Sequence, residues 1–314
     1  MENHSLLCGQ PLRKNLATYI TLGSMAISSS LVSSVLQERV FSTMKGTKFA
    51  EHITALTIFS HLVLGAPEMF LFRTRRKGKL RNHLFLSLCT YSGLALSNRS
   101  LQHLDYSTRT ALKSVKILPV MLVSMKLVGK EYTAGQWSSA LLLVTGSSLC
   151  YLGNVRSELH YDLTGVLLIF IAMTIDAAAA NFEERYLFKC PAPSTTAEVI
   201  CFTSLFGSLH GVVLISISGQ KFNEMQGLAS HSLLLGHVFA FSLFSYFSMS
   251  LTLKIIEVFG ATKAELVKSL RRLLTLLASF ILFDKRITVL HMVGFSFFFF
   301  SLLASSSTTR VCML

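Results

Sequence analysis

Two short basic stretches lie inside long apolar segments, and they constrain this chain more than any other feature. They read Lys113-Ser114-Val115-Lys116 and Lys268-Ser269-Leu270-Arg271-Arg272. A cation at the centre of a membrane-spanning helix costs about 2.5–3.5 kcal/mol on insertion scales. Because the chain keeps five of them in two matching places, we expect a compensating anion, and the anion that we favour is a transported one.

The composition predicts a protein embedded in a membrane. Apolar residues make up 51% of the 314 residues and charged residues 14%, whereas soluble domains carry about 25% charged residues. Mean hydropathy is +0.54, and apolar stretches recur at the length that crosses about 30 Å of hydrocarbon as a helix. We therefore expect an all-α integral membrane protein that forms a single polytopic domain over residues 1–314. The ten predicted transmembrane helices are 17–36, 50–72, 82–102, 107–128, 134–153, 163–187, 196–218, 232–256, 260–284 and 287–308.

Two pairs of similar short segments predict an internal repeat. Leu36-Gln37-Glu38-Arg39 closes the first predicted span, and Phe182-Glu183-Glu184-Arg185 comes near the end of the sixth. The two basic stretches lie in the fourth and ninth spans, again at equivalent places. An odd number of helices in each half inverts the second half across the membrane, and transporters built this way hold their substrate between the halves. We expect two inverted five-helix repeats, at about 17–153 and 163–308, around a central cavity.

The connection between the second and third spans carries a dense basic cluster. Lys and Arg are retained on the cytosolic side of membranes, so the cluster predicts a cytosolic loop and, with an even number of spans, two cytosolic termini. The net charge of +13 has a strong local contribution from this loop, so we expect no nucleic-acid partner. The members of the cluster are Arg73, Arg75, Arg76, Lys77, Lys79 and Arg81.

The spacing inside the two basic stretches predicts an anion site. Residues three and four apart share a helix face, so Arg109, Lys113 and Lys116 form one stripe, and Lys268 lies beside Arg271 and Arg272. Arg binds phosphate through its bidentate fork, whereas Lys supplies a point charge. We expect both faces to line a water-filled cavity that binds a multiply charged anion. Pro119, just after the first stretch, permits a bend in its helix.

The alternative is that these cations pair with acids inside the membrane. Spacing predicts such pairs for Lys254 with Glu257 and for Glu265 with Lys268. A third interpretation places cations at the lipid headgroups, which fits Arg109 and Lys263 but not the residues near mid-span. The acids available for pairing are Glu68, Asp176, Glu183, Glu184, Glu257 and Glu265. We expect none of them to be near enough in sequence to pair with Lys113, Lys116, Arg271 or Arg272.

Three polar residues are further candidates for the site. Asn98 and Asn181 lie within spans, where an amide contacts a cargo or bonds neighbouring helices. Gln37 ends a span, where an interfacial role competes with a cargo contact. The ten histidines show no metal-ligand spacing, and no glycine-rich phosphate loop, nucleophile elbow or kinase signature is present. We expect no metal, no cofactor and no enzymatic activity.

Several motifs spread over nearly the whole chain belong together. They are Leu36-Gln37-Glu38, Ser97-Asn98-Arg99-Ser100-Leu101, Lys113 to Met121, Leu163-Thr164-Gly165-Val166 followed by Asp176-Ala177, Asn181 and Glu184, and Phe259-Gly260-Ala261 followed by Arg271-Arg272. On these motifs the chain resembles the nucleotide-sugar transporters of the drug/metabolite transporter superfamily. The closer similarity is to the branch that carries UDP-sugars and 3′-phosphoadenosine 5′-phosphosulfate (PAPS), and within that branch to the second PAPS transporter subgroup.

The resemblance implies an antiporter of the Golgi or endoplasmic reticulum membrane. Such a protein imports a nucleotide-activated donor into the lumen and exports a nucleoside monophosphate. We favour PAPS as the cargo, with a UDP-sugar of the UDP-galactose or UDP-glucose type as the alternative. The resemblance further implies that the basic residues of the fourth and ninth spans hold the phosphates and that polar residues of other spans contact base and sugar.

Departures from the family pattern bear on specificity. Lys268 replaces a residue that is usually uncharged, and Arg272 replaces a common lysine. The extra cation suits a more highly charged cargo or is neutralised by Glu265, and both interpretations stay open. From another class, a polytopic membrane enzyme of lipid-linked transfer is an alternative, although no His/Asp constellation supports it. For the oligomeric state, a homodimer is one alternative.

Overall fold

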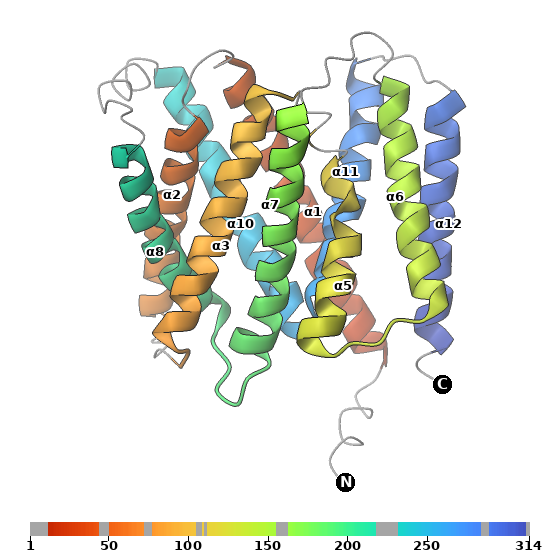
Figure 1. Ribbon diagram of the computed structural model, residues 1–314, viewed down its shortest axis with the longest axis horizontal. Helices are drawn as coiled ribbons and strands as arrows, with labels where there is room; N and C mark the ends of the chain where they lie inside the picture. Colours follow the sequence, from red (N-terminus) through yellow and green to blue (C-terminus); the bar gives the residue numbers. More distant parts are fainter. Residues whose placement is uncertain are drawn as a thin grey trace.

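The computed structural model describes residues 12–43, 50–71, 77–104, 109, 112–154, 163–217, 232–283 and 289–311, and the regular structure in these ranges is helical. Figure 1 shows the helices standing side by side, with the start of α1 and the end of α12 at the same, lower end. Their bounds are α1 Leu12–Thr43, α2 Ala50–Leu71, α3 Leu80–Arg99, η1 Ser100–Gln102, η2 Lys113–Lys116, α5 Ile117–Val128, α6 Ala134–Asn154, α7 Leu163–Phe182, η3 Glu183–Phe188, α8 Thr196–Ile217, α10 Ser232–Phe259, α11 Ala261–Phe283 and α12 Val289–Val311.

Every predicted span has helix at its place, and five of the helices are long and apolar enough to cross a membrane. Those five segments are Ala17–Gln37, His52–Phe70, Leu163–Phe188, Thr196–Ser216 and Gly236–Phe259. The α11 helix is absent from this group although it has 23 residues, because its basic residues lower its hydropathy. That all ten predicted spans cross a membrane stays a prediction.

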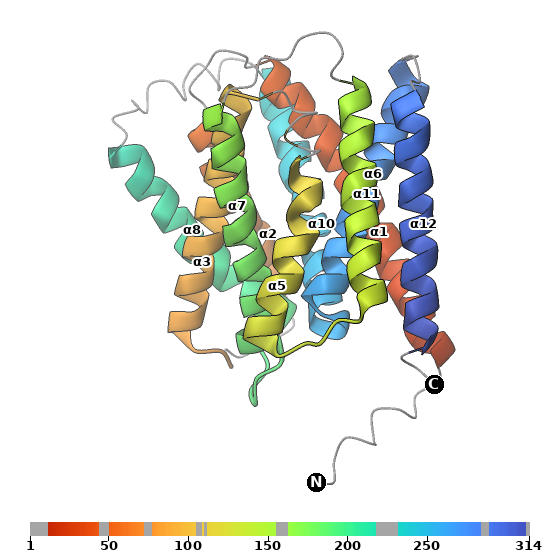
Figure 2. The same ribbon diagram turned by 45° about the vertical axis from the view of Figure 1, so that its right-hand side comes forward.

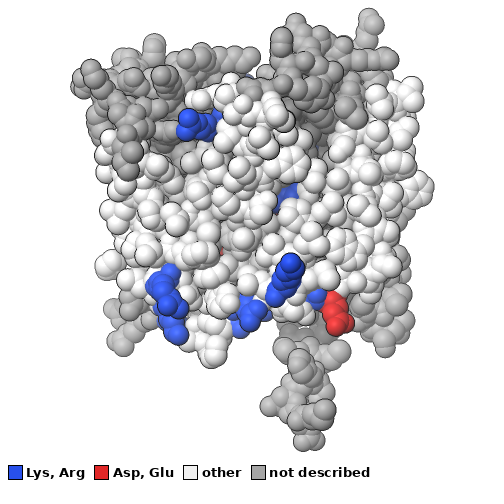
Figure 3. Space-filling view, viewed as in Figure 1, with Lys and Arg blue, Asp and Glu red and all other residues white. Residues whose placement is uncertain are grey.

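The outer surface of the helices is apolar. Large hydrophobic side chains point outward from several helices, among them Phe59 of α2, Val212 of α8 and Phe239 of α10, each more than half exposed. A soluble protein rarely presents so much contiguous apolar surface. On the face shown in Figure 3, the charged side chains gather toward the lower edge and few lie over the middle. This distribution matches a bundle surrounded by lipid.

The helices pack in a paired arrangement that Figures 1 and 2 show from two directions. The most extensive contacts join α6 with α12, α1 with α10, α2 with α8, and α3 with α7. The α5 and α11 helices contact each other and also contact α7 and α1, respectively. The helices of two of these four pairs, α1 with α10 and α3 with α7, all contribute side chains to the cavity described below.

Hydroxyl groups fasten the helix pairs at buried positions. Ser139 of α6 and Ser301 of α12 bond reciprocally, since each hydroxyl donates to the other residue's carbonyl oxygen, at 2.9 and 2.8 Å. The hydroxyls of Ser30 on α1 and Ser248 on α10 are also hydrogen-bonded to each other. Between spanning helices, where apolar packing gains nothing over lipid, such bonds contribute about 0.6 kcal/mol each.

The lower end of the bundle is tied together by one buried carboxylate, Glu184 of η3. Its oxygens contact the ammonium groups of Lys130 and Lys189, each at 2.6 Å, and accept the backbone N–H of Ala261 at 2.7 Å. We call these four groups the Glu184 junction. It joins the α5–α6 connection, the end of η3 and the start of α11. Burial lowers the pKa of Lys130, and its hydrogen bond to Glu184 opposes that shift.

Gly260 makes the junction sterically feasible. It turns the chain between α10 and α11 with φ +90°, a left-handed conformation that disfavours any residue with a Cβ. A Cβ at this position would lie 2.8 Å from Glu184 Oε1 and 2.9 Å from Lys130 Nζ. Gly129, at the end of α5, also has a positive φ, of 75°, but a Cβ there would meet nothing within 4 Å.

These two glycines give a matched pair of substitutions. We expect Gly129→Ala to cost only the conformational term, about 1–2 kcal/mol of unfolding free energy. Gly260→Ala should cost more, because the new methyl group also displaces the Glu184 carboxylate from its partners. Thermal unfolding of the purified protein in detergent measures the difference, and equal shifts in Tm for the two variants would contradict the role assigned to the junction.

Candidate functional site

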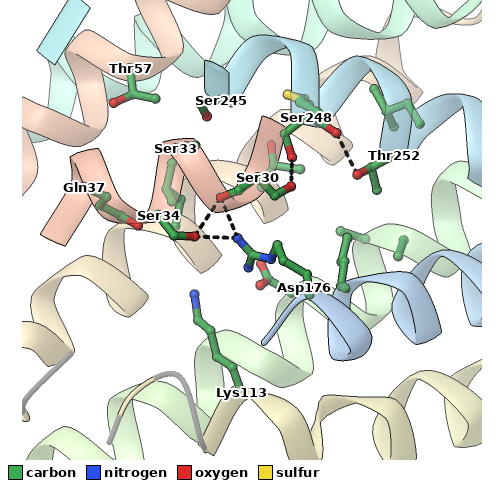
Figure 4. Close-up of a pocket in the computed structure, with 18 of the residues that line it drawn as sticks. Ser30, Ser33, Ser34, Gln37, Thr57, Lys113, Asp176, Ser245, Ser248 and Thr252 are labelled. Atoms are coloured by element: carbon green, nitrogen blue, oxygen red, sulfur yellow. Dashed lines mark hydrogen bonds between the residues drawn. The ribbon is translucent and has the colours of Figure 1, made fainter. Parts of the chain in front are cut away.

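A cavity of about 370 Å³ lies inside the bundle, a size typical of small-molecule sites. Side chains from α1, α2, α3, α7, α10 and α11, from the η2 and η3 turns and from Arg109 line it. Figure 4 shows Ser30, Ser34 and Gln37 of α1, Asp176 of α7 and Lys113 of η2 around the same space. Its ionisable lining residues are His61, Arg109, Lys113, Lys116, Asp176, Glu183, Lys268, Arg271 and Arg272.

The first basic stretch reaches the cavity from the tight η2 turn. Pro119 lies shortly after it and has no N–H, so the Val115 carbonyl lacks its α-helical partner there. Lys113 is half-buried, and its ammonium makes no hydrogen bond or ion pair with any residue in the described ranges. Its side chain points into the cavity (Figure 4). Lys113 is thus placed to contact a ligand.

Lys116 is buried and paired. Its ammonium lies 3.4 Å from Asp176 Oδ2 and 3.6 Å from Glu265 Oε2. Gly93 of α3 leaves room for the Asp176 carboxylate, because a Cβ at that position would overlap Asp176 Oδ1. Lys116 therefore contributes positive potential to the cavity while its charge is partly compensated.

The second basic stretch is organised by Glu265, which lies behind the cavity wall on α11. Its carboxylate contacts Arg272 Nη2 at 2.9 Å and Lys268 Nζ at 3.9 Å. The predicted pair of Glu265 with Lys268 is confirmed, as is the pair of Lys254 with Glu257 at 2.9 Å.

The pairing of Arg272 and Lys116 with Glu265 was not foreseen. Glu265 and Arg272 are seven residues apart, which is two helical turns and therefore the same face, so the sequence held that signal. The contact of Glu265 with Lys116 joins two separate helices, and no spacing rule reveals it.

Arg272 also joins the two basic stretches directly. Its Nη1 donates to the backbone carbonyl oxygen of Lys113 at 2.6 Å. Arg271, the neighbouring residue on α11, donates from Nη1 to the Ser34 hydroxyl at 2.8 Å, across the cavity wall on α1. The matched stretches predicted from the sequence thus lie side by side at one cavity.

Two of the predicted polar site residues, Asn98 and Gln37, line the cavity and bind Arg109. Arg109 Nη1 donates to Asn98 Oδ1 at 3.2 Å, and its Nη2 donates to Gln37 Oε1 at 3.4 Å. Asn98 Nδ2 donates in turn to the Thr54 hydroxyl at 2.7 Å. The expectation that Arg109 extends to the lipid headgroups is wrong, because this side chain is buried in the cavity wall.

The third polar candidate, Asn181, lies outside the cavity lining. It is fully buried, and its Nδ2 donates to the carbonyl oxygens of Val120 at 3.1 Å and Ala177 at 2.9 Å. Asn181 therefore fastens α7 to α5, and its position does not support the predicted cargo contact. The sequence analysis also missed lining residues that have no charge signal, among them Ser30, Ser34 and Ser245.

The cavity has an excess of positive charge. Six Lys and Arg side chains line it against two carboxylates, Asp176 and Glu183. Adding Glu265 behind the wall gives three acids, so the local excess is 6 − 3 = 3 positive charges. Uncompensated charge in a low-dielectric interior is costly, so this arrangement favours binding of a multiply charged anion.

Comparison with known proteins places the chain in a family. The UAA transporter family profile matches residues 19–309, and the chain belongs to the UAA transporter family. It is therefore a multi-pass membrane transporter rather than an enzyme. A crystal structure of another protein with 12% sequence identity superposes with a TM-score of 0.69 over 94% of this chain and 99% of that one, which supports the fold.

Three proteins of similar sequence are named as transporters of one compound. The chain is 28% identical over 262 residues to Adenosine 3'-phospho 5'-phosphosulfate transporter 2 of Mus musculus, covering 82% of this chain and 70% of that protein. The protein of the same name in Homo sapiens is 28% identical, with 82% and 64% covered. That of Aedes aegypti is 27% identical, with 82% and 68% covered. The matched region thus spans about two thirds of these relatives.

The shared carboxylate of Glu265 predicts a large stability effect. We expect Glu265→Gln to lower the free energy of unfolding by about 3–5 kcal/mol, because it leaves Lys116 and Arg272 buried without their common counter-charge. The control is Glu257→Gln, which removes a partly exposed pair worth about 0–1 kcal/mol. Thermal unfolding in detergent compares the two. A Glu265→Gln variant as stable as the control would show that other groups compensate these cations.

Proposed function

We propose that this protein is an antiporter of the Golgi or endoplasmic reticulum membrane, importing PAPS into the lumen in exchange for a nucleoside monophosphate. Two observations support the proposal. The three similar proteins described above are named for transport of this compound. The cavity has the charge that such a cargo requires.

The excess positive charge is the observation that carries an anionic cargo, and the names of the similar proteins carry the choice among anions. PAPS has a 3′-phosphate, a bridging phosphate and a sulfate, with a total charge of about −4, because a phosphate monoester carries about −1.5 to −2. A UDP-sugar carries only the charge of its diphosphate, about half as much. The excess of three positive charges in the cavity region lies midway between these two cargo charges, so it supports an anionic cargo of either kind. We favour PAPS over the UDP-sugar alternative because the similar proteins are named for its transport.

Different roles are proposed for the basic side chains. Lys113 makes no hydrogen bond or ion pair within the described ranges, and Arg271 donates a hydrogen bond to the hydroxyl of Ser34. We therefore assign direct binding of phosphate or sulfate to these two residues. Lys116, Lys268 and Arg272 share Glu265 and supply positive potential from fixed positions. Asn98 and Gln37 hold Arg109 in the wall and present their remaining polar atoms to the nucleoside.

We further propose that ten helices cross the membrane as two inverted repeats, at about 17–153 and 163–308. The packing supports this. The repeat relates α1 to α7, α2 to α8, α3 to α10, α5 to α11 and α6 to α12. Under this relation the pair α1 with α10 corresponds to the pair α7 with α3, and the pairs α2 with α8 and α6 with α12 correspond to themselves. All of these pairs are observed. The reciprocal bonds of Ser139 and Ser301 fit a two-fold relation between α6 and α12.

The positive charge of the empty cavity gives a physical reason for the exchange of one anion for another. Reorienting the bundle without cargo would carry uncompensated cations through low dielectric, at a cost of several kcal/mol. Either anion removes that cost, so the loaded protein reorients faster. With the termini in the cytosol, the Glu184 junction closes the cytosolic end of the bundle, and this junction must separate for cargo to enter from that side.

Transport assays with the purified protein in liposomes test the proposal. Uptake of radiolabelled PAPS into vesicles preloaded with adenosine monophosphate should exceed uptake into empty vesicles by at least about tenfold, the factor expected from removing a barrier of about 1.4 kcal/mol. Excess unlabelled PAPS should compete more strongly than UDP-galactose or UDP-glucose. Stronger competition by a UDP-sugar would assign the protein to the alternative cargo, and equal rates in loaded and empty vesicles would rule out obligatory exchange.

Substitutions at the two proposed anion ligands form a second test. Lys113→Ala and Arg271→Ala should each raise the half-saturating PAPS concentration by about 10-fold or more, because a hydrogen bond to a charged group is worth about 1.5–3 kcal/mol. Lys254→Ala is the control, since Lys254 pairs with Glu257 outside the cavity. Both cavity variants should insert into membranes normally. Normal transport by both would place the anion site elsewhere.

A further inference from the structure

One carboxylate in the anion cavity has no partner. Glu183, the first residue of η3, lines the cavity and is 6% exposed. Within the described ranges it makes no hydrogen bond and no ion pair, unlike the other acids near the cavity. Asp176 pairs with Lys116, and Glu265 contacts Lys116, Lys268 and Arg272. A buried carboxylate without a partner at an anion site calls for a physical explanation.

The charged groups that face Glu183 come from three elements. Lys116 of η2 and Lys268 of α11 attract a negative charge at this position, whereas Asp176 of α7 repels it. The α3, α5 and α10 helices also pack against η3, and the residues that α3 and α10 contribute to the lining are not ionisable, while α5 contributes none. The other ionisable residues that line the cavity are His61 of α2, Lys113 of η2, Arg271 and Arg272 of α11, and Arg109.

Occupation of the cavity reverses the surroundings of this carboxylate. In the empty protein, Lys116 and Lys268 favour the ionised form of Glu183. When the phosphate or sulfate groups of a cargo occupy the cavity, their negative charge offsets the positive potential of these two ammonium groups, and Glu183 faces an additional anion. Both burial and a nearby negative charge disfavour an ionised carboxylate. The neutral, protonated form of Glu183 is then the stable one.

We propose that Glu183 is a proton-binding site that fills when anionic cargo occupies the cavity, so that the loaded protein carries a proton across the membrane together with the anion. The proposal rests on the proposed function only in requiring an anionic cargo. The proton comes from water on the side where the cargo enters, binds a carboxylate oxygen, and returns to water where the cargo leaves. By reciprocity, protons must also strengthen cargo binding.

The test is the pH dependence of exchange in liposomes, measured with equal pH on both sides. Wild-type affinity for PAPS should rise as the pH falls, by up to about tenfold per pH unit, the limit for one coupled proton. Glu183→Gln is permanently neutral, so its affinity should not follow pH in this way. Glu183→Asp keeps a titratable group and should keep the dependence. Glu257→Gln removes an acid outside the cavity and should show the wild-type profile.

A second measurement covers the case in which Glu183→Gln is inactive. Addition of PAPS to the purified wild-type protein in weakly buffered detergent solution should withdraw protons from the medium, up to one per protein, and a pH-sensitive dye follows this uptake. Saturable PAPS binding without proton uptake would overturn the proposal, as would identical pH profiles for the wild type and Glu183→Gln. Absence of nucleotide transport at every pH would instead refute the proposed function, so the two failures are distinguishable.

Discussion

The site depends on one buried carboxylate that is shared by cations from two parts of the chain. Glu265 contacts Lys116 from η2 and both Lys268 and Arg272 from α11. Without it, the two basic stretches would repel each other at close range in a medium of low dielectric. With it, they lie side by side and still leave a positive excess facing the cavity. Structural pairing and the proposed anion binding are thus compatible within one cluster.

The side chains around this cluster differ according to whether they face outward, toward lipid, or inward, toward the cavity. Outward-facing positions carry large apolar side chains such as Phe239 and Val212, whereas the cavity wall carries serines, threonines and amides. Hydroxyl groups such as those of Ser30 and Ser248 bond to each other between helices. A wall of this kind offers short polar groups to a ligand without adding charges that would need compensation.

Much of this arrangement was predictable from local patterns. The apolar stretches located the helices, and the repeated basic stretches located the cavity. Residue spacing predicted the pairs Glu265–Lys268 and Lys254–Glu257, which are observed. The sequence predictions that failed concern residues whose contacts join segments far apart in the chain. The sequence could not show that Arg109 bends inward to Asn98, or that Asn181 bonds the backbone of α5, because both depend on which helices become neighbours.

The η3 segment has a consequence for leakage through the membrane. It has π-helical geometry, a rare form that concentrates at functional sites, and its first two residues serve different places. Glu183 faces the cavity, and the next residue, Glu184, ties three connections at one end. Since these two residues share one peptide bond, a backbone shift of η3 that moves one of them also displaces the other. Under the proposed function, cargo in the chamber and closure of its exit are thereby coupled through the backbone.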